Sequence, residues 1–172
     1  MDVNEAISRR KSIRKWQDKE VAGEIITELL DAARRAPSAK NVQSHRYFVV
    51  KGKTKDKLVA AGAFKQPFLK DAPAIIVCIA DPTQYPQSVD VDETPEHYAY
   101  IDLSIAASFL VLRATELGLG TVFVAWIYRD KIREALDIPE NYIIPFVLPI
   151  GYPDEDPPAK PRKSLEEIVI QS

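Results

Sequence analysis

The chain has 172 residues, of which 46% are hydrophobic and 28% are charged, a balance typical of one soluble globular domain. Twenty-three basic residues against 25 acidic ones give a net charge of −2, and this balance gives no indication of bulk attraction to nucleic acid or to an anionic membrane. The single cysteine, Cys78, excludes a disulfide scaffold. Together with an acidic and polar first segment, residues 1–5, it leads us to expect a cytoplasmic protein without a signal peptide.

The first half of the chain is predicted to contain helices and strands. Asp2 and Glu5 have the spacing of a helix capping box, and the short helix that they begin is expected to end near Arg10. Apolar residues at three- and four-residue spacing predict a second helix over 20–36, which Pro37 stops. We expect a short strand over 46–51 and a helix over 55–64. The apolar run 74–80 predicts a strand that is covered on both faces.

The second half begins with a long polar segment and continues with an apolar one. Residues 81–102 carry six acidic residues, three prolines and no Lys or Arg, which predicts a solvated loop. The stretch 99–117 predicts a buried helix rather than a membrane span, because Asp102, Arg113 and Glu116 interrupt it. Gly118 is expected to cap this helix in the left-handed conformation. A strand over 121–126, a helix over 129–136 and a strand over 143–150 complete the compact part.

The last segment, residues 153–172, contains four prolines and is expected to be extended, with a late strand over 167–170. The mixture of helices with a few buried strands predicts the α+β class, as one domain over 1–172 with a central sheet between helical layers. A chain of this size has little interior in which to bury a helix that is apolar on all sides. Such a helix therefore predicts a subunit interface and a homodimer.

Two basic clusters lie at opposite ends of the chain. Residues 9–16 contain five cations in eight positions, and residues 160–163 form a second cluster in the tail. The simplest interpretation of each cluster is a solvated charged surface. The alternative is an anion site, because guanidinium forks and a hydroxyl bind a phosphate in ways that one lysine cannot. If both clusters meet in space, they hold one phosphate dianion.

Two further polar or glycine-containing segments are ambiguous alone. Residues 36–45 contain the helix stop Pro37, which is followed by short polar side chains. Without further evidence, this composition is explained by an ordinary turn. Gly118-Leu119-Gly120 is not a dinucleotide fingerprint. It ends a helix instead of opening one, and Phe123 stands where the third glycine belongs.

The remaining candidates for chemistry have simpler structural explanations. Cys78 lies in an apolar strand and is expected to be a core residue rather than a nucleophile. His45 and His97 are far apart in sequence and accompany no serine motif, which argues against a catalytic triad. Residues 90–97 carry oxygen ligands but lack the spacing of a known metal site, so no metal is predicted.

Four motifs in this order resemble the nitroreductase family of flavin mononucleotide (FMN) oxidoreductases, over nearly the whole chain. Arg10-Lys11-Ser12-Ile13-Arg14 is similar to the family's phosphate and flavin segment, and the sequence P-S-A-K-N-V-Q over 37–43 resembles its flavin turn. Residues 102–121 resemble its central helix and the turn that follows. Residues 149–153, followed by Lys160-Pro161-Arg162, resemble its closing motif and phosphate-clamping tail.

The resemblance implies a three-layer sandwich in which helices flank a central, mostly antiparallel sheet. The extended tail, residues 153–172, would clamp the cofactor and reach the partner subunit. The family binds FMN at the interface of a homodimer. NAD(P)H and a small acceptor, such as a nitroaromatic or a quinone, would react in turn through flavin N5. No catalytic side chain is needed for such hydride transfer, because the cofactor carries the reaction.

The resemblance also assigns roles at the cofactor. The two basic clusters would hold the phosphate, and Arg14 would sit near flavin N1 and O2. The turn 37–43, presented by the partner subunit, would border the ring and the ribityl chain. Gln66 would reach the polar flavin edge, and the Ala125 backbone N–H would lie near N5. The implied cofactor-binding residues are Arg10, Lys11, Ser12, Arg14, Pro37, Ser38, Asn41, Gln43, Gln66, Phe123, Ala125, Trp126, Lys160 and Arg162.

The sequence also departs from the family's pattern. Ser44-His45 stands where many members have Pro-Trp, which implies altered packing beside the ring. Residues 81–102 leave no room for the helical insertion that covers the active site in longer members, which implies an open or differently built pocket. Two other functions remain open: a flavin-fragmenting or dehalogenating member of the same family, and a non-catalytic protein that binds FMN or another phosphate ester.

Overall fold

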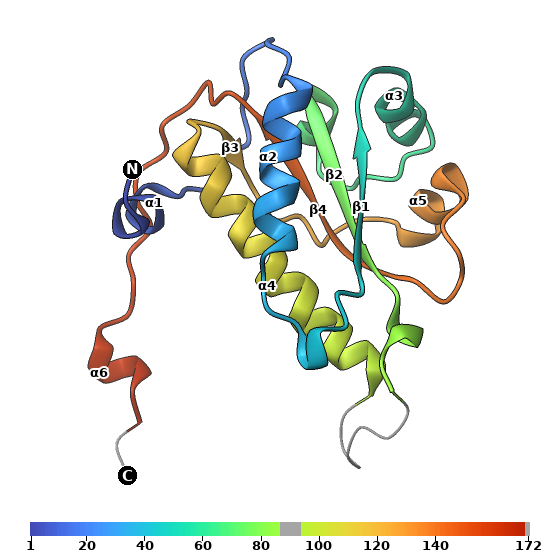
Figure 1. Ribbon diagram of the computed structural model, residues 1–172. Helices are drawn as coiled ribbons and strands as arrows, with labels where there is room; N and C mark the ends of the chain where they lie inside the picture. The colour runs from blue at the N-terminus through green and yellow to red at the C-terminus, as the bar shows by residue number, and fades with distance from the viewer. Residues whose placement is uncertain (87–93, 171–172) are drawn as a thin grey trace.

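A computed structural model of the chain describes residues 1–86 and 94–170 (Figure 1). Short 3-10 helices occur at Ala39–Asn41, Pro67–Asp71 and Pro82–Gln84. The strand β2 and the helix α5 have the bounds that the sequence predicts. The helices and strands are α1 (Val3–Arg9), α2 (Gly23–Arg34), β1 (His45–Val50), α3 (Gly52–Ala60), β2 (Ala74–Ala80), α4 (Pro95–Glu116), β3 (Gly120–Thr121), α5 (Arg129–Leu136), β4 (Ile143–Gly151) and α6 (Leu165–Ile168).

The strands form one antiparallel sheet in the order β1-β2-β4-β3. Val77, in the middle of β2, lies opposite Phe48 of β1 and opposite Val147 of β4. Every residue of β2 is buried. Successive side chains of a strand point to opposite faces, so an apolar strand of this kind needs cover on both sides.

Helices supply that cover and create a core on each face of the sheet (Figure 1). On one face, Ile76 and Cys78 of β2 belong to a core with residues of α2 and α4, such as Leu103. On the other face, Leu58 of α3 and Ile132 of α5 are fully buried in a core with Ile75, Val77 and Ile79 of β2. The expected α+β fold with helical layers around a central sheet is therefore confirmed.

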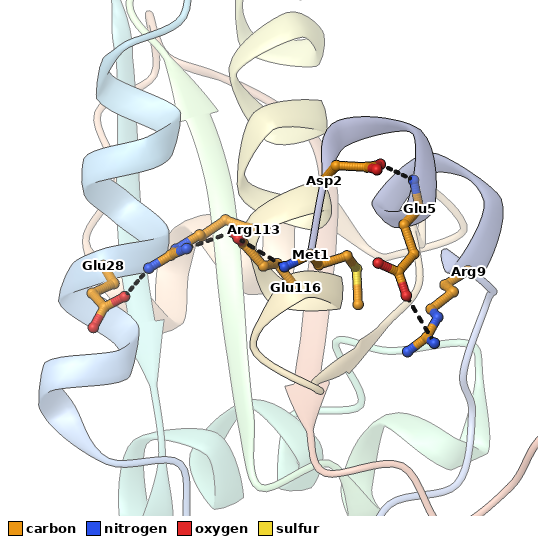
Figure 2. Close-up of polar contacts among 7 residues, drawn as sticks. All are labelled: Met1, Asp2, Glu5, Arg9, Glu28, Arg113 and Glu116. Carbon is orange, nitrogen blue, oxygen red and sulfur yellow. Dashed lines mark hydrogen bonds and ion pairs between the residues drawn. The ribbon is translucent and has the colours of Figure 1, made fainter.

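The first helix begins at the predicted cap. The Glu5 backbone N–H donates a hydrogen bond to Oδ1 of Asp2 at 2.8 Å. The Glu5 carboxylate pairs with Arg9 at 2.8 Å, one turn along the helix (Figure 2). The capping carboxylate therefore stabilises the N-terminus of α1, while Glu5 stabilises its last turn.

An arginine joins the two helices that cover the first face of the sheet. Arg113 of α4 pairs with Glu28 of α2 at 2.5 Å and also with Glu116 on its own helix (Figure 2). Glu116 in turn lies 4.0 Å from the N-terminal ammonium of Met1. The C-terminal part of α4 is thus connected by charge to α2 and to the start of the chain.

The predicted solvated loop over 81–102 is wrong at both of its described ends. At its start, Pro82–Gln84 form a 3-10 helix, and Asp81, Pro82 and Tyr85 are buried. Residues 95–102 are the first two turns of α4, and the Thr94 side chain accepts a hydrogen bond from the His97 N–H at 3.3 Å. Pro95 and Glu96, which suggested a loop, stand in the first turn of a helix, where proline and acidic residues are both favourable. Residues 87–93 of the predicted loop lie outside the described residues.

The helix α4 is long and apolar enough to cross a membrane by length and composition alone. In the structure it packs against α2 and the sheet, and Leu103, Ala107 and Leu110 are fully buried. Gly118 follows its end with a φ of 74°, so the predicted left-handed cap is confirmed. The buried helix of the sequence analysis is therefore correct in type, and only its start was placed too late.

The predicted strand over 121–126 is wrong after Thr121. Only residues 120–121 pair continuously with β4, and Val124 forms a single bridge to Val147. Phe123, Ala125 and Trp126 are exposed. Their β-forming side chains suggested a strand, but the segment leaves the sheet and turns outward.

Other elements also differ from the prediction, and α2 covers 23–34 instead of 20–36. The helix α3 covers 52–60 instead of 55–64, because Gly62, with a φ of 64°, turns the chain just after it. The predicted late strand over 167–170 is wrong, since residues 165–168 form the short helix α6. A capping box begins that helix: the Glu167 N–H donates to Ser164 Oγ, and the Ser164 N–H donates to Glu167 Oε2.

Candidate functional site

The N-terminal basic segment lies directly beside β3. The Ile13 N–H donates a hydrogen bond to the Thr121 carbonyl at 3.0 Å, and Trp16 Nε1 donates to the Gly120 carbonyl at 3.0 Å. A Cβ at Gly120 would lie only 2.7 Å from Ile13, so this close approach requires glycine. The contact fixes Arg14 next to the exposed segment that follows β3.

A pocket of about 230 Å³ forms where Arg14 meets that segment. Five of the predicted cofactor-binding residues, from three distant parts of the sequence, line it together. The bridge between Phe64 and Ile127 holds the chain before Gln66 against the chain after Trp126. The lining residues are Arg14, Gln66, Phe68, Val122, Phe123, Val124, Ala125 and Trp126.

The pocket presents polar groups beside exposed aromatic rings. The Arg14 guanidinium is exposed and donates to the Ser12 carbonyl at 3.2 Å. The Ala125 N–H donates no hydrogen bond to any described residue, although Val124 on its N-terminal side donates to Val147 at 3.0 Å. Phe123 is 43% exposed, and its ring meets Phe146 edge-on at 5.1 Å. A cation, an amide, a free N–H and apolar rings together suit a planar heterocycle with a polar edge.

The pocket is small for a cofactor. Ligand pockets usually enclose roughly 300–1,000 Å³, so these residues form one wall of a site and not a closed cavity. A complete site needs further surface from another part of the chain or from another subunit.

The start of the tail packs along the basic segment and brings acidic residues to it. Lys11 Nζ lies 2.5 Å from Asp156, and Glu155 accepts hydrogen bonds from the Arg14 and Lys15 N–H groups at 2.5 and 3.3 Å. The Asp154 N–H donates to the Lys15 carbonyl at 3.0 Å. These contacts, which were not predicted from the sequence, partly neutralise the basic segment.

The second basic cluster lies elsewhere in the single chain. Lys160 and Arg162 are exposed, and the Arg162 guanidinium donates to the backbone carbonyls of residues 160 and 161 at 3.2 and 3.3 Å. Among the described residues, no ion pair or hydrogen bond joins these side chains to Arg10, Lys11 or Ser12. Figure 1 shows the tail leaving the body of the protein beside α1.

The turn 37–43 lies at the opposite end of α4 from β3 (Figure 1). Its backbone is strained, because Lys40, Asn41 and Gln43 have φ values of 50°, 57° and 53°. The Ser38 Oγ accepts a hydrogen bond from the Gln43 N–H at 3.0 Å. Pro37, Asn41 and Gln43 are exposed, so this turn is a preformed surface feature that one chain does not bring to the pocket.

A buried carboxylate holds the turn in place. Asp102 of α4 is 3% exposed, and its Oδ2 accepts hydrogen bonds from the Ala39 N–H at 2.9 Å and from the Tyr85 hydroxyl at 2.5 Å. The Ser44 hydroxyl completes the network at 3.0 Å from the Tyr85 oxygen. Burial, and then the hydrogen bond to Asp102, raise the pKa of Tyr85 to about 12. The sequence feature that could have indicated this network is Asp102, an acidic residue within the most apolar part of the helix.

Two other titratable side chains near this region are buried. The pKa of His45 is lowered, first by burial and then by Arg46, and its Nδ1 has no hydrogen-bond partner among the described residues. Burial raises the pKa of the Cys78 thiol, which is completely buried. Cys78 is therefore a core residue, as predicted.

The chain is similar to proteins of one family over most of its length. The family model described as "Nitroreductase family" matches residues 7–63 and 57–152. A relative from Methanothermobacter thermautotrophicus, provisionally named NADH dehydrogenase/NAD(P)H nitroreductase, is 37% identical over 176 residues, covering 99% of this chain and 87% of the relative. An FMN reductase [NAD(P)H] of Bacillus subtilis is 27% identical, over 99% of this chain and 73% of that protein.

Solved structures show the same fold. The crystal structure of a nitroreductase family protein from Clostridium difficile 630 has a TM-score of 0.86 and 33% sequence identity, over 99% of this chain and 98% of the other. An FMN-dependent nitroreductase from Clostridium difficile R20291 has a TM-score of 0.79 and 32% identity, over 97% of this chain and 96% of the other.

Proposed function

The chain belongs to the nitroreductase family, and on that premise we propose that it is an FMN-dependent oxidoreductase that uses NAD(P)H to reduce a small acceptor, such as a nitroaromatic or a quinone. The observation that carries this proposal is the convergence of Arg14, Gln66 and the Ala125 N–H on one exposed pocket. When bound, FMN supplies the capacity to accept and return a hydride.

The pocket residues have complementary tasks toward such a cofactor. The Arg14 guanidinium stabilises negative charge at the polar edge of a bound ring, which favours the reduced form. The Gln66 amide both donates and accepts hydrogen bonds at that edge. The Ala125 N–H is a donor of fixed position, since its neighbour Val124 is bound to β4. Phe123 and Trp126 offer apolar contact to a planar ring.

The phosphate of the cofactor is assigned to the basic clusters. Arg10, Lys11 and Ser12 lie on the segment that leads into the pocket, so a phosphate held there leaves the ring free to reach Arg14. Lys160 and Arg162 are exposed and available for the same anion. The acidic residues 154–156 neutralise part of the first cluster, so cations from the second cluster would strengthen the binding of a phosphate dianion.

A homodimer supplies the missing wall of the site. Tyr100, Ile101 and Phe109 of α4 are 41–43% exposed, and a second copy of the chain can cover them. The exposed apolar residues of the tail, Leu165 and Ile168, need similar cover. In this arrangement the turn 37–43 of one subunit completes the pocket of the other.

Visible spectroscopy tests the proposal. The purified protein, or the protein incubated with FMN, is expected to be yellow, to bleach with anaerobic NADH or NADPH, and to recover its colour on addition of a quinone or nitroaromatic. A protein that stays colourless after incubation with FMN contradicts the proposal. Flavin that binds but never bleaches indicates the non-catalytic binding protein instead.

A further inference from the structure

Two lysines and two aromatic rings form a cluster at the edge of the pocket, which we call the cationic rim: Lys65, Trp126, Tyr128 and Lys131. The Lys65 ammonium lies 4.5 Å from the Tyr128 ring centroid and 5.4 Å from that of Trp126. The Lys131 ammonium lies 5.1 Å from the Tyr128 centroid. Trp126 belongs to both the cationic rim and the pocket, so the two surfaces are continuous.

The backbone holds these four side chains in place. The Tyr128 N–H donates to the Ala63 carbonyl at 2.9 Å, and Phe64 bridges Ile127, so the segment that carries Lys65 is fixed beside the aromatic residues. Tyr128 is also the residue before α5, which places Lys131 in the first turn of that helix. A Cβ at Gly62 would lie 3.2 Å from Lys131 Nζ, so that ammonium packs closely on the turn after α3.

Without a ligand, the cationic rim is energetically unfavourable for the protein. Trp126 is 61% exposed and Tyr128 is 46% exposed. Neither lysine forms an ion pair within the described residues, and two like charges that flank one ring repel each other. A cation over an exposed ring contributes little to stability. That contribution explains one lysine at Tyr128 but gives no reason for a second.

A ligand with an aromatic ring and a negative charge satisfies all of these groups. Its ring covers the exposed indole of Trp126, and its negative charge compensates the positive charge of the two ammonium groups. A neutral ring leaves the like charges uncompensated. An anion without a ring leaves the indole exposed to water.

We propose that the cationic rim binds the electron acceptor and selects planar aromatic molecules that carry a carboxylate or sulfonate. The assignment of this ligand as the acceptor rests on the proposed oxidoreductase function, but the binding itself does not. Trp126 connects the two sites, so an acceptor held there has its ring at the mouth of the pocket. Lys65 and Lys131 are then specificity-determining residues.

Tryptophan fluorescence tests the binding without any turnover. The chain has two tryptophans, and Trp16 is buried while Trp126 is exposed, so a quencher at the rim acts on Trp126. The probes are 4-nitrobenzoate and 4-nitrobenzamide, which have similar shape but differ in charge. We expect 4-nitrobenzoate to bind about tenfold more tightly, the effect of one charge-assisted hydrogen bond. The Trp126→Phe variant should lose the quenching.

Lysine variants decide whether the rim causes this preference. Lys65→Ala and Lys131→Ala should each reduce the preference for 4-nitrobenzoate several-fold, and Lys65→Arg should retain most of it. Lys53→Ala, which removes an exposed lysine of α3, is the matched control and should change nothing. Equal binding of the two probes to the unaltered protein, or an equal effect of Lys53→Ala and Lys65→Ala, overturns the proposal.

Steady-state kinetics with NADH or NADPH then separates binding from function. The ratio of kcat/KM for 4-nitrobenzoate to that for 4-nitrobenzamide should fall several-fold in the two alanine variants, with little change for the amide itself. A protein without flavin or turnover contradicts the proposed oxidoreductase, yet the fluorescence titration still tests the rim. An unchanged ratio in an active enzyme contradicts the role in acceptor selection.

Discussion

The hydroxyl of Tyr85 donates a hydrogen bond to the buried carboxylate of Asp102 at 2.5 Å. The same carboxylate oxygen accepts the Ala39 N–H at 2.9 Å, so the long helix α4 holds the strained turn 37–43. A turn with three non-glycine residues at positive φ persists only where its surroundings stabilise it. The helix that provides the subunit interface in our proposal therefore also shapes the turn assigned to the cofactor.

Replacing Asp102 tests this relationship. Asp102→Asn removes the charge that strengthens both hydrogen bonds, and we expect the free energy of unfolding to fall by about 1–3 kcal/mol. Denaturant unfolding measures this change, and hydrogen exchange should show faster exchange of the Ala39 amide. Asp56→Asn, at an exposed site on α3, is the control. Equal effects of the two substitutions would show that the network adds no stability.

The raised pKa of Tyr85 predicts a loss of stability at alkaline pH. Because its pKa is about 12 in the folded protein and near 10 in the unfolded chain, its contribution is complete below pH 10 and disappears as the pH rises through 12. The contribution of Tyr85 to the free energy of unfolding should fall by about 1–3 kcal/mol over this range. Tyr85→Phe should be less stable at pH 8 but lose less on alkaline titration. An equal pH dependence in both proteins contradicts the assignment.

Arg14 is expected to matter for cofactor affinity and not for the fold, because its side chain is exposed. Loss of a charged hydrogen bond costs about 1.5–3 kcal/mol, so Arg14→Ala should weaken FMN binding roughly 10- to 150-fold. Quenching of flavin fluorescence on binding measures the affinity. Arg34→Ala removes another exposed arginine, on α2, and should leave it unchanged. If both variants bind FMN like the unaltered protein, Arg14 is not at the cofactor.

Phe109 tests the homodimer. A glutamate on the exposed side of α4 would bury a charge in the proposed interface, which costs several kcal/mol per unpaired ion. Phe109→Glu should therefore be a monomer by light scattering and should lose FMN, since each site needs the partner's turn. Val49→Glu, on the exposed side of β1, should stay dimeric. A dimeric Phe109→Glu protein with bound flavin would place the interface elsewhere.

Most of the fold was predictable because its signals are local. The apolar run of β2, the periodicity of α5 and the glycine after α4 each act within a few residues. The predictions were wrong in segments whose conformation depends on contacts with residues that are distant in sequence. Residues 122–126 have the composition of a strand, but only Val124 finds a bridging partner on β4.

Some residues of the candidate site could likewise be predicted from the sequence, and others could not. The family resemblance predicted that Arg14, Gln66 and Ala125 bind the cofactor, and the structure brings these residues to one pocket. The cationic rim could not be predicted, since neither Lys65 nor Lys131 stands in a recognisable motif. Their relationship exists only because both flank the ring of Tyr128. The pairing of the acidic residues 154–156 with the basic segment is likewise a product of the tail's path.

The central strand of the sheet imposes an order on biosynthesis. Both faces of β2 and both of its edges are covered in the folded protein, yet one of its neighbours, β4, is translated only after α4 and α5. Until then the uncharged segment A-I-I-V-C-I-A has an open edge, the kind of sequence that assembles into intermolecular sheets. A nascent chain that stalls before β4 emerges from the ribosome is therefore a client for chaperones, and fragments that end there should precipitate on expression.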